Sequence, residues 1–247
     1  MYNTGQIGQH SQAAYKLDEI MQAAFRFIRH NREEINEFAV KKFIKIRLKA
    51  NNLISEKDNP IVAFGSNTSF IHYFARSKSI RQLQENDLAL IDLWARQKEA
   101  RAPYADITWM GFCGDQIPPD YQQKFKILIE ARDLAVLHIR RSLEKGNIPI
   151  AGEIDLVVRE HFGQYGLQKN FLHTTGHPLG ITSAHGQRGG GIWLENKKPL
   201  ASNLPYTIEP GIYFKNCFGL RSEIDFYIDD NHELIITSEP QKKLIQI

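Results

Sequence analysis

Apolar side chains recur every three or four residues in four stretches of the chain, the spacing of one buried helix face. The pattern predicts helices over about residues 9–30, 34–51, 119–146 and 151–165. Pro118 and Pro119 open the third helix, where the missing amide of a proline is tolerated. The first two helices carry no chemical signal, and we interpret them as packing elements.

Runs rich in β-branched and aromatic residues predict strands after each pair of helices. One β run covers Ile61–Phe64 and leads through a polar turn to an apolar segment that ends at His72. Two more strands flank the charged loop Arg96–Arg101. The runs TIEPGIYF and GLRSEIDFYI predict a hairpin around the loop Lys215–Gly219, and a strand follows at about Glu233–Thr237.

The order helix, helix, strands therefore occurs twice, over about residues 8–115 and 118–247. Sequence identity between the two stretches is slight, so the repeat is one of pattern. We expect an α+β fold in which two pseudo-symmetric halves share a curved antiparallel sheet that the helices cover. Residues 1–247 are expected to form a single domain.

Four carboxylates lie in the middle of these apolar strands: Asp92, Asp106, Glu209 and Glu223. Acidic residues are uncommon in strands, and a buried carboxylate without a partner costs several kcal/mol or loses its charge. For one hairpin taken alone, an outward and solvated face is the simpler interpretation. Four carboxylates at matching places in both halves favour a shared cation instead.

The segment FLHTTGHPLGITSAH adds three histidines within 13 residues. Oxygen ligands with a single imidazole suit two divalent ions of the Mn, Co, Fe or Zn type. Two such ions share a hydroxide, lower its pKa and polarise a carbonyl group. The candidate ligands are Asp92, Asp106, His177, Glu209 and Glu223, whose four carboxylates balance about the charge of two dications.

The motifs resemble those of the pita-bread metallopeptidases, the group that holds methionine aminopeptidase, aminopeptidase P and prolidase. The resemblance covers nearly the whole chain and rests on LIDLWA, YADIT, HTTGHPLG, TIEPGIY and RSEID, which fill the five ligand positions in the family's order. It implies that Asp92 chelates one ion, that Asp106 and Glu223 bridge, and that His177 and Glu209 hold the other. The resemblance also implies a catalytic role for Glu209.

The family's accessory histidines match His72, His173 and His185, the last of them eight residues after His177 where the family has seven. The resemblance implies that they hydrogen-bond the substrate carbonyl or the tetrahedral intermediate. The R-x-E-x-D element around Glu223 and the histidine–tyrosine pair at His72 resemble the prolidase and aminopeptidase P branch.

Three features depart from that branch. The spacing from Asp92 to Asp106 is three residues longer than usual, and Trp109 stands where the branch has arginine. The separate N-terminal domain of the branch is expected to be absent. Arg221 is expected to hold a metal-bound carboxylate, and contact with a substrate carboxylate is the alternative.

The resemblance implies a dinuclear-metal-dependent peptidase that hydrolyses the N-terminal bond of peptides, with an Xaa-Pro preference. A methionine aminopeptidase-like activity and a non-catalytic or creatinase-like member of the fold are the alternatives. A serine or cysteine hydrolase is disfavoured, because no G-x-S-x-G element occurs and neither Cys113 nor Cys217 has a histidine nearby in sequence.

The charge balance and the distribution of apolar residues limit the kinds of molecule that this protein is expected to bind. The chain has 31 basic and 28 acidic residues, a net charge of +3, which gives no reason to expect nucleic acid. The N-terminal stretch has no signal-peptide pattern, and no apolar run approaches the roughly 20 residues that span a bilayer. We therefore expect a cytoplasmic protein without a membrane partner, with free thiols, a peptide substrate and a possible homodimer.

Overall fold

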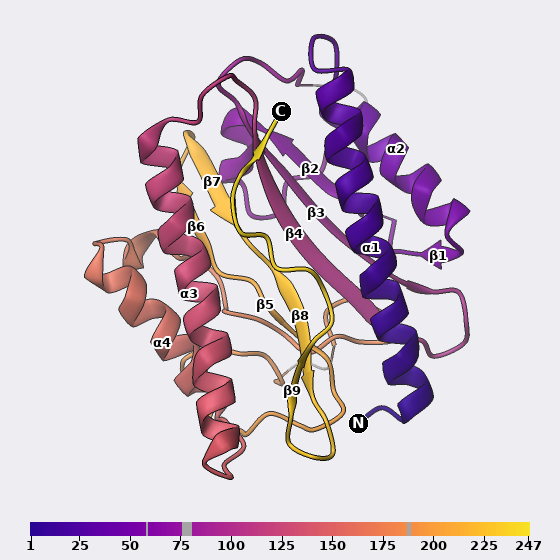
Figure 1. Ribbon diagram of the computed structural model, residues 1–247, viewed down its shortest axis with the longest axis vertical. Helices are drawn as coiled ribbons and strands as arrows, with labels where there is room; N and C mark the ends of the chain where they lie inside the picture. The colour runs from indigo at the N-terminus through magenta and orange to yellow at the C-terminus, as the bar shows by residue number, and fades with distance from the viewer. Residues whose placement is uncertain (58, 76–80, 187–188) are drawn as a thin grey trace.

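Pairs of helices alternate with strands along the chain (Figure 1). The computed structural model describes residues 1–57, 59–75, 81–186 and 189–247. The four predicted helices are confirmed, with ends that shift by up to five residues: α1 (Thr4–His30), α2 (Glu37–Ala50), α3 (Pro119–Glu144) and α4 (Ala151–Gln164). Two short 3₁₀ helices, η1 (Gly65–Ser69) and η2 (Gln168–Asn170), lie in the connections.

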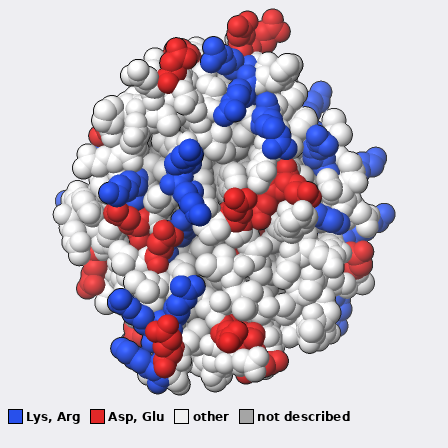
Figure 2. Space-filling view, viewed as in Figure 1, with Lys and Arg blue, Asp and Glu red and all other residues white. Residues whose placement is uncertain are grey.

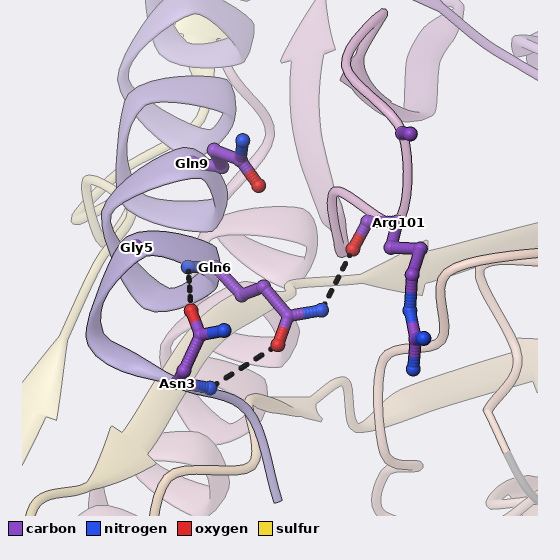
Figure 3. A pocket seen from close by; sticks show the side chains of 6 residues that line it. Asn3, Gly5, Gln6, Gln9 and Arg101 are labelled. Atoms are coloured by element: carbon purple, nitrogen blue, oxygen red, sulfur yellow. Dashed lines mark hydrogen bonds between the residues drawn. The ribbon is translucent and has the colours of Figure 1, made fainter.

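Helix α1 begins earlier than its apolar stripe because polar side chains cap its first turn. The Asn3 side chain accepts the Gln6 amide at 2.9 Å, and the Gln6 side chain accepts the Asn3 amide at 3.2 Å. This reciprocal pair is a capping box. Gln6 also donates to the Arg101 carbonyl at 3.0 Å, which ties α1 to the loop between the two longest strands (Figure 3).

Those strands, β3 (Leu88–Gln97) and β4 (Tyr104–Phe112), form the antiparallel centre of the first sheet. The predicted strand β2 (Ile61–Phe64) and the short β1 (Leu53–Ile54) pair with β3. On the other side, β10 (Ile245–Gln246) pairs parallel to β4. This C-terminal pairing was not predicted, because a two-residue strand leaves no alternation to recognise.

The predicted C-terminal hairpin is present but interrupted. The outer pair is β5 (Tyr206–Ile208) with β8 (Ile224–Ile228), and the inner pair is β6 (Gly211–Phe214) with β7 (Phe218–Arg221). The register continues unchanged across the break, so Glu209 lies opposite Glu223. The turn is also shorter than predicted, since Phe218 and Gly219 already belong to β7. The last predicted strand is β9 (Leu234–Ile236), which pairs with β8.

Each face of β3 and β4 packs against a different half of the molecule. Ala89, Ile91 and Leu93 contact the core under α1 and α2, whereas Leu88 and Leu90 belong to the core under α3 and α4. Figure 1 shows the two helix pairs on opposite sides of these strands. Because side chains alternate along a strand, Asp92 shares the face of Leu88 and Leu90. The strand carboxylates therefore lie between the two halves.

The surface carries charges of both signs. Lysine and arginine side chains are interspersed with acidic ones on the face that Figure 2 shows. None of the helices in the described part of the chain is long and apolar enough to cross a membrane. Cys113 is buried, Cys217 is exposed, and both are free thiols.

Candidate metal centre

Three of the predicted ligands, from three separate segments, converge between the halves. Asp106 on β4, His177 in the connection after η2, and Glu223 at the hairpin break each place one ligand atom within 4.8 Å of the others. His177 Nε2 also lies 3.4 Å from Glu209 Oε1 and 4.0 Å from Asp106 Oδ2. Four predicted ligands thus face a common point.

The fifth predicted ligand, Asp92, reaches the same region through strand register. Asp92 pairs with Thr108 across β3 and β4, and Thr108 forms a β-bridge to Glu223 on its other side. The Thr108 hydroxyl donates to Glu223 Oε2 at 2.7 Å. The carboxylate of Asp92 itself forms an ion pair with the Arg221 guanidinium, which extends from the end of β7.

A close backbone approach places His177 beside Glu209. The His177 amide donates to Thr207 Oγ1 at 3.0 Å, and the Thr207 amide donates to the His177 carbonyl at 2.9 Å. A Cβ atom on the preceding residue, Gly176, would lie 2.0 Å from the Thr207 carbonyl oxygen. Glycine is therefore required at 176, and this contact sets the depth at which His177 enters the site.

Burial and like charge disfavour the ionised form of the acidic groups in the absence of a cation. Burial and the neighbouring Glu223 raise the pKa of Asp106 well above its usual value. Burial, followed by Glu209, does the same to the pKa of Glu223. Burial raises the pKa of Glu209 to about 7, although Arg221 opposes that rise. The cluster is thus a strong acceptor of positive charge.

The donor set fits divalent ions. His177 Nδ1 lies 3.1 Å from the Pro178 carbonyl, which can only accept, so Nδ1 carries the proton and the Nε2 lone pair faces the carboxylates. Burial lowers the pKa of His177, which keeps the imidazole neutral. Asp106 Oδ1 is buried and has no hydrogen-bond partner among the described residues. The Nε2 lone pair lies 3.4 Å from a Glu209 oxygen and 4.0 Å from an Asp106 oxygen, and these groups repel unless a cation lies between them.

The three accessory histidines occupy different surroundings. His173 Nδ1 lies 2.8 Å from the Thr174 carbonyl, so its Nε2 accepts from the Tyr213 hydroxyl at 2.9 Å. Burial lowers the pKa of His173 to about 3. The His185 ring stacks on that of His177, with centroids 4.3 Å apart. His72 is exposed, and its chain neighbours Ile71 and Tyr73 are half-buried.

Sequence reasoning missed the polar residues that hold these groups in place. Thr207 donates to Glu209 Oε1 at 3.3 Å, Thr108 orients Glu223, and Tyr213 contacts His173. Asp225 accepts the Asp106 amide at 2.9 Å from the next strand. The alternation of the hairpin does place Thr207 and Tyr213 on the face of Glu209, so that signal was available.

The model of metallopeptidase family M24 matches residues 9–230, which is most of the chain. The chain belongs to metallopeptidase family M24. Among curated relatives, an Xaa-Pro dipeptidase from Pyrococcus furiosus is 28% identical over 228 residues, 92% of this chain and 60% of its own length. An uncharacterized peptidase, YqhT, from Bacillus subtilis is 28% identical over 211 residues, 85% of this chain and 55% of its own.

Solved structures agree with the family's fold. A recombinant prolidase from Thermococcus sibiricus superimposes with a TM-score of 0.85 at 28% identity, covering 100% of this chain and 62% of that one. The predicted pita-bread fold, and its likeness to the prolidase branch, are thus confirmed. The chain spans about three fifths of the length of these relatives.

Proposed function

We propose that this chain is a dinuclear-metal-dependent exopeptidase that removes the N-terminal residue of peptides, with a preference for Xaa-Pro bonds. The observation that supports it most is the convergence of Asp106, His177 and Glu223, with Glu209 and Asp92 beside them. Family membership supports metal-dependent peptide hydrolysis. The Xaa-Pro dipeptidases among its relatives support the choice of bond.

Residues 1–247 are proposed to act as one catalytic unit, because the five ligands come from both halves. Asp92, Asp106, His177, Glu209 and Glu223 would hold two ions of the Mn, Co, Zn or Fe type, which supply a Lewis acid and a water activated at neutral pH. The count and identity of the ions belong to this proposal.

The chain's own residues would orient the ligands and handle the proton. Arg221 fixes Asp92, Thr108 fixes Glu223, and Thr207 fixes Glu209 by direct hydrogen bonds. Neutral His173 accepts a hydrogen bond from the Tyr213 hydroxyl at Nε2, at 2.9 Å. We propose that the Tyr213 hydroxyl, positioned by this contact, turns its proton from Nε2 to the substrate's carbonyl oxygen when a peptide binds. His72 and His185 would contact the substrate from the two edges of the site.

A peptide panel with controlled metal content tests the proposal. The purified protein is stripped with chelator, reloaded with Mn, Co, Zn or Fe, and analysed for bound metal per chain. Dipeptides and tripeptides with proline or alanine after the scissile bond are compared with peptides that begin with methionine. We expect two ions per chain and kcat/KM highest for proline.

Several results would count against the proposal. Stoichiometric binding of two ions with hydrolysis of Met-Ala peptides and none of Xaa-Pro peptides would favour the methionine aminopeptidase-like activity. Purification without metal at the five residues, with no hydrolysis after reloading, would favour a non-catalytic member of the fold. Sedimentation of the same sample tests the predicted homodimer.

A further inference from the structure

His72 is an exposed residue, and each of its two neighbours in the chain forms a hydrogen bond with a buried charged side chain. The carbonyl of Ile71 accepts from Arg221 Nη1 at 3.3 Å. The hydroxyl of Tyr73 donates to Glu37 Oε2 at 2.6 Å. His72 is therefore fixed through its backbone, while its own ring lies in solvent.

Glu37, the first residue of α2, is the centre of that support. Its side chain is completely buried, and its carboxylate accepts three hydrogen bonds from residues that the structure describes. The donors are the Phe64 amide at 2.7 Å, Asn67 Nδ2 at 2.9 Å and the Tyr73 hydroxyl at 2.6 Å. Asn67 Nδ2 also lies 2.9 Å from the Tyr73 hydroxyl. All three donors belong to residues 64–73, the segment that carries His72.

A buried carboxylate with three donors constrains those donors strongly. Hydrogen bonds to an ionised acceptor are stronger than neutral ones, and a buried charge that loses a donor is costly. Burial and then Glu37 raise the pKa of Tyr73, so its hydroxyl stays protonated and remains a donor. The contact joins residues 36 positions apart, from a helix to a loop. Segment 64–73 thus has one energetically favoured position against α2.

The second half of the molecule contains a comparable contact. Asp155 on α4 is completely buried and accepts from the Thr175 amide at 3.1 Å and from Thr175 Oγ1 at 2.7 Å. Arg159, which pairs with Asp155 at 2.5 Å, donates to the His173 carbonyl at 3.0 Å. In each half, therefore, a buried carboxylate on the second helix holds the segment that carries an accessory histidine.

We propose that Glu37 is a positioning residue that places His72 at the site by holding Tyr73 and Asn67. The inference rests on the proposed function, in which His72 contacts the substrate. Glu37 does not itself reach the reacting atoms, because it is buried beneath segment 64–73. Its effect passes through the backbone on both sides of His72.

A double-mutant cycle tests whether Tyr73 acts through His72. In metal-loaded protein, Tyr73→Phe is expected to lower kcat about tenfold, as the loss of a hydrogen bond to a charged group does, with metal content and KM nearly unchanged. In a His72→Ala background the same substitution should cause no further loss. Equal losses in both backgrounds would mean that Tyr73 acts independently of His72 and would overturn the proposal.

Amide hydrogen exchange supplies a readout that does not need peptidase activity. Glu37→Gln keeps one of the two acceptor oxygens, so exchange should rise at residues 64–75 and stay unchanged at 171–177. Asp155→Asn should give the opposite pattern. Asp18 is a buried carboxylate on α1 that accepts the Glu239 amide, so Asp18→Asn serves as a control and should change exchange in neither region.

The two readouts separate the possible failures. Unchanged exchange at 64–75 in both Glu37→Gln and Tyr73→Phe would overturn the positioning role, whatever the activity. If exchange rises there but His72→Ala keeps wild-type kcat, the contact is upheld and the proposed catalytic role of His72 is wrong. Should Glu37→Gln fail to fold, the milder Tyr73→Phe decides alone, because it removes one hydroxyl and leaves the carboxylate buried with its other donors.

Discussion

Arg221 and Asp92 form a buried ion pair across the two halves of the molecule. Only 4% of the Arg221 side chain and 10% of the Asp92 side chain are exposed. The guanidinium also donates to the Ile71 carbonyl at 3.3 Å. Arg221 thus contacts a predicted metal ligand and the His72 segment at once. This geometry favours the ligand-orienting interpretation of Arg221 over contact with a substrate carboxylate.

Arg221→Lys is expected to weaken metal binding and lower turnover by about 10- to 100-fold. A lysine ammonium lacks the forked guanidinium that contacts Asp92 and the Ile71 carbonyl at once. The loss should be similar for dipeptides and for longer peptides. Metal titration and steady-state kinetics with both substrate lengths measure it. A rise in KM confined to dipeptides, with unchanged metal affinity, would instead assign Arg221 to the substrate carboxylate.

Asp106→Asn and Glu223→Gln are each expected to abolish turnover while the fold is kept. Both side chains belong to the converging group, and each is proposed to bridge the ions. Circular dichroism checks the fold, and activity is measured at saturating metal. Residual activity above about a tenth of the wild-type value in either variant would contradict the dinuclear assignment.

His173→Ala is expected to reduce kcat by roughly 10²–10³-fold with metal content preserved, because it removes the partner that positions the Tyr213 hydroxyl as a donor to the developing oxyanion. Tyr213→Phe is the matched variant, since it removes only the hydroxyl that His173 accepts. Elemental analysis accompanies the kinetics. Loss of metal in His173→Ala would show that this histidine is a ligand after all.

Chelation should destabilise the protein more at high pH than at low pH. The pKa values of Asp106, Glu209 and Glu223 are raised in the metal-free fold, Glu209 to about 7. A carboxylate whose pKa is raised on folding stabilises the fold in its protonated form. This stabilisation is complete below the pKa of the unfolded chain, near 4, and is lost as pH rises through the pKa of the folded state. The melting-temperature gap between metal-loaded and metal-free protein should therefore widen from pH 5 to pH 8. A gap that is constant or narrows would be inconsistent with this cluster.

The helices and the positions of the unusual carboxylates were predictable, because local periodicity records which side chains are buried. Asp92 and Asp106 stand out within apolar strands, and β3 and β4 fold as that pattern indicates. Helix ends were less accurate where a polar cap decides them, as Asn3 does for α1.

Contacts between distant residues were not predictable from periodicity. Arg221 and Asp92 are 129 positions apart, and Glu37 meets Tyr73 only after α2 packs beside η1. The break in the hairpin at Glu209 and Glu223 also has no signature in alternation, although Pro210 cannot donate to a strand ladder and marks its place. Such pairings depend on tertiary packing, which a single sequence does not encode locally.

Asp18 gives a test of pH dependence away from the metal centre. Its side chain on α1 is buried, Oδ2 accepts the Glu239 amide at 2.9 Å, and Oδ1 has no hydrogen-bond partner in the described part of the chain. Burial raises the pKa of Asp18 from 3.8 to about 7, and the charge of Glu239 adds to the rise. Folding therefore favours the protonated carboxyl, and this contribution to stability is lost as pH rises from about 4 through 7.

Asp18→Asn removes the titration while keeping an oxygen for the Glu239 amide. We expect the free energy of unfolding of the variant minus that of the wild type to increase by on the order of 1–3 kcal/mol between pH 5 and pH 8. Urea denaturation at saturating metal measures the difference at each pH, so that effects common to both proteins cancel. Parallel stability profiles for the two proteins over that range would mean that Asp18 is already ionised in the folded state at pH 5, since a buried group that titrates near 7 must separate them.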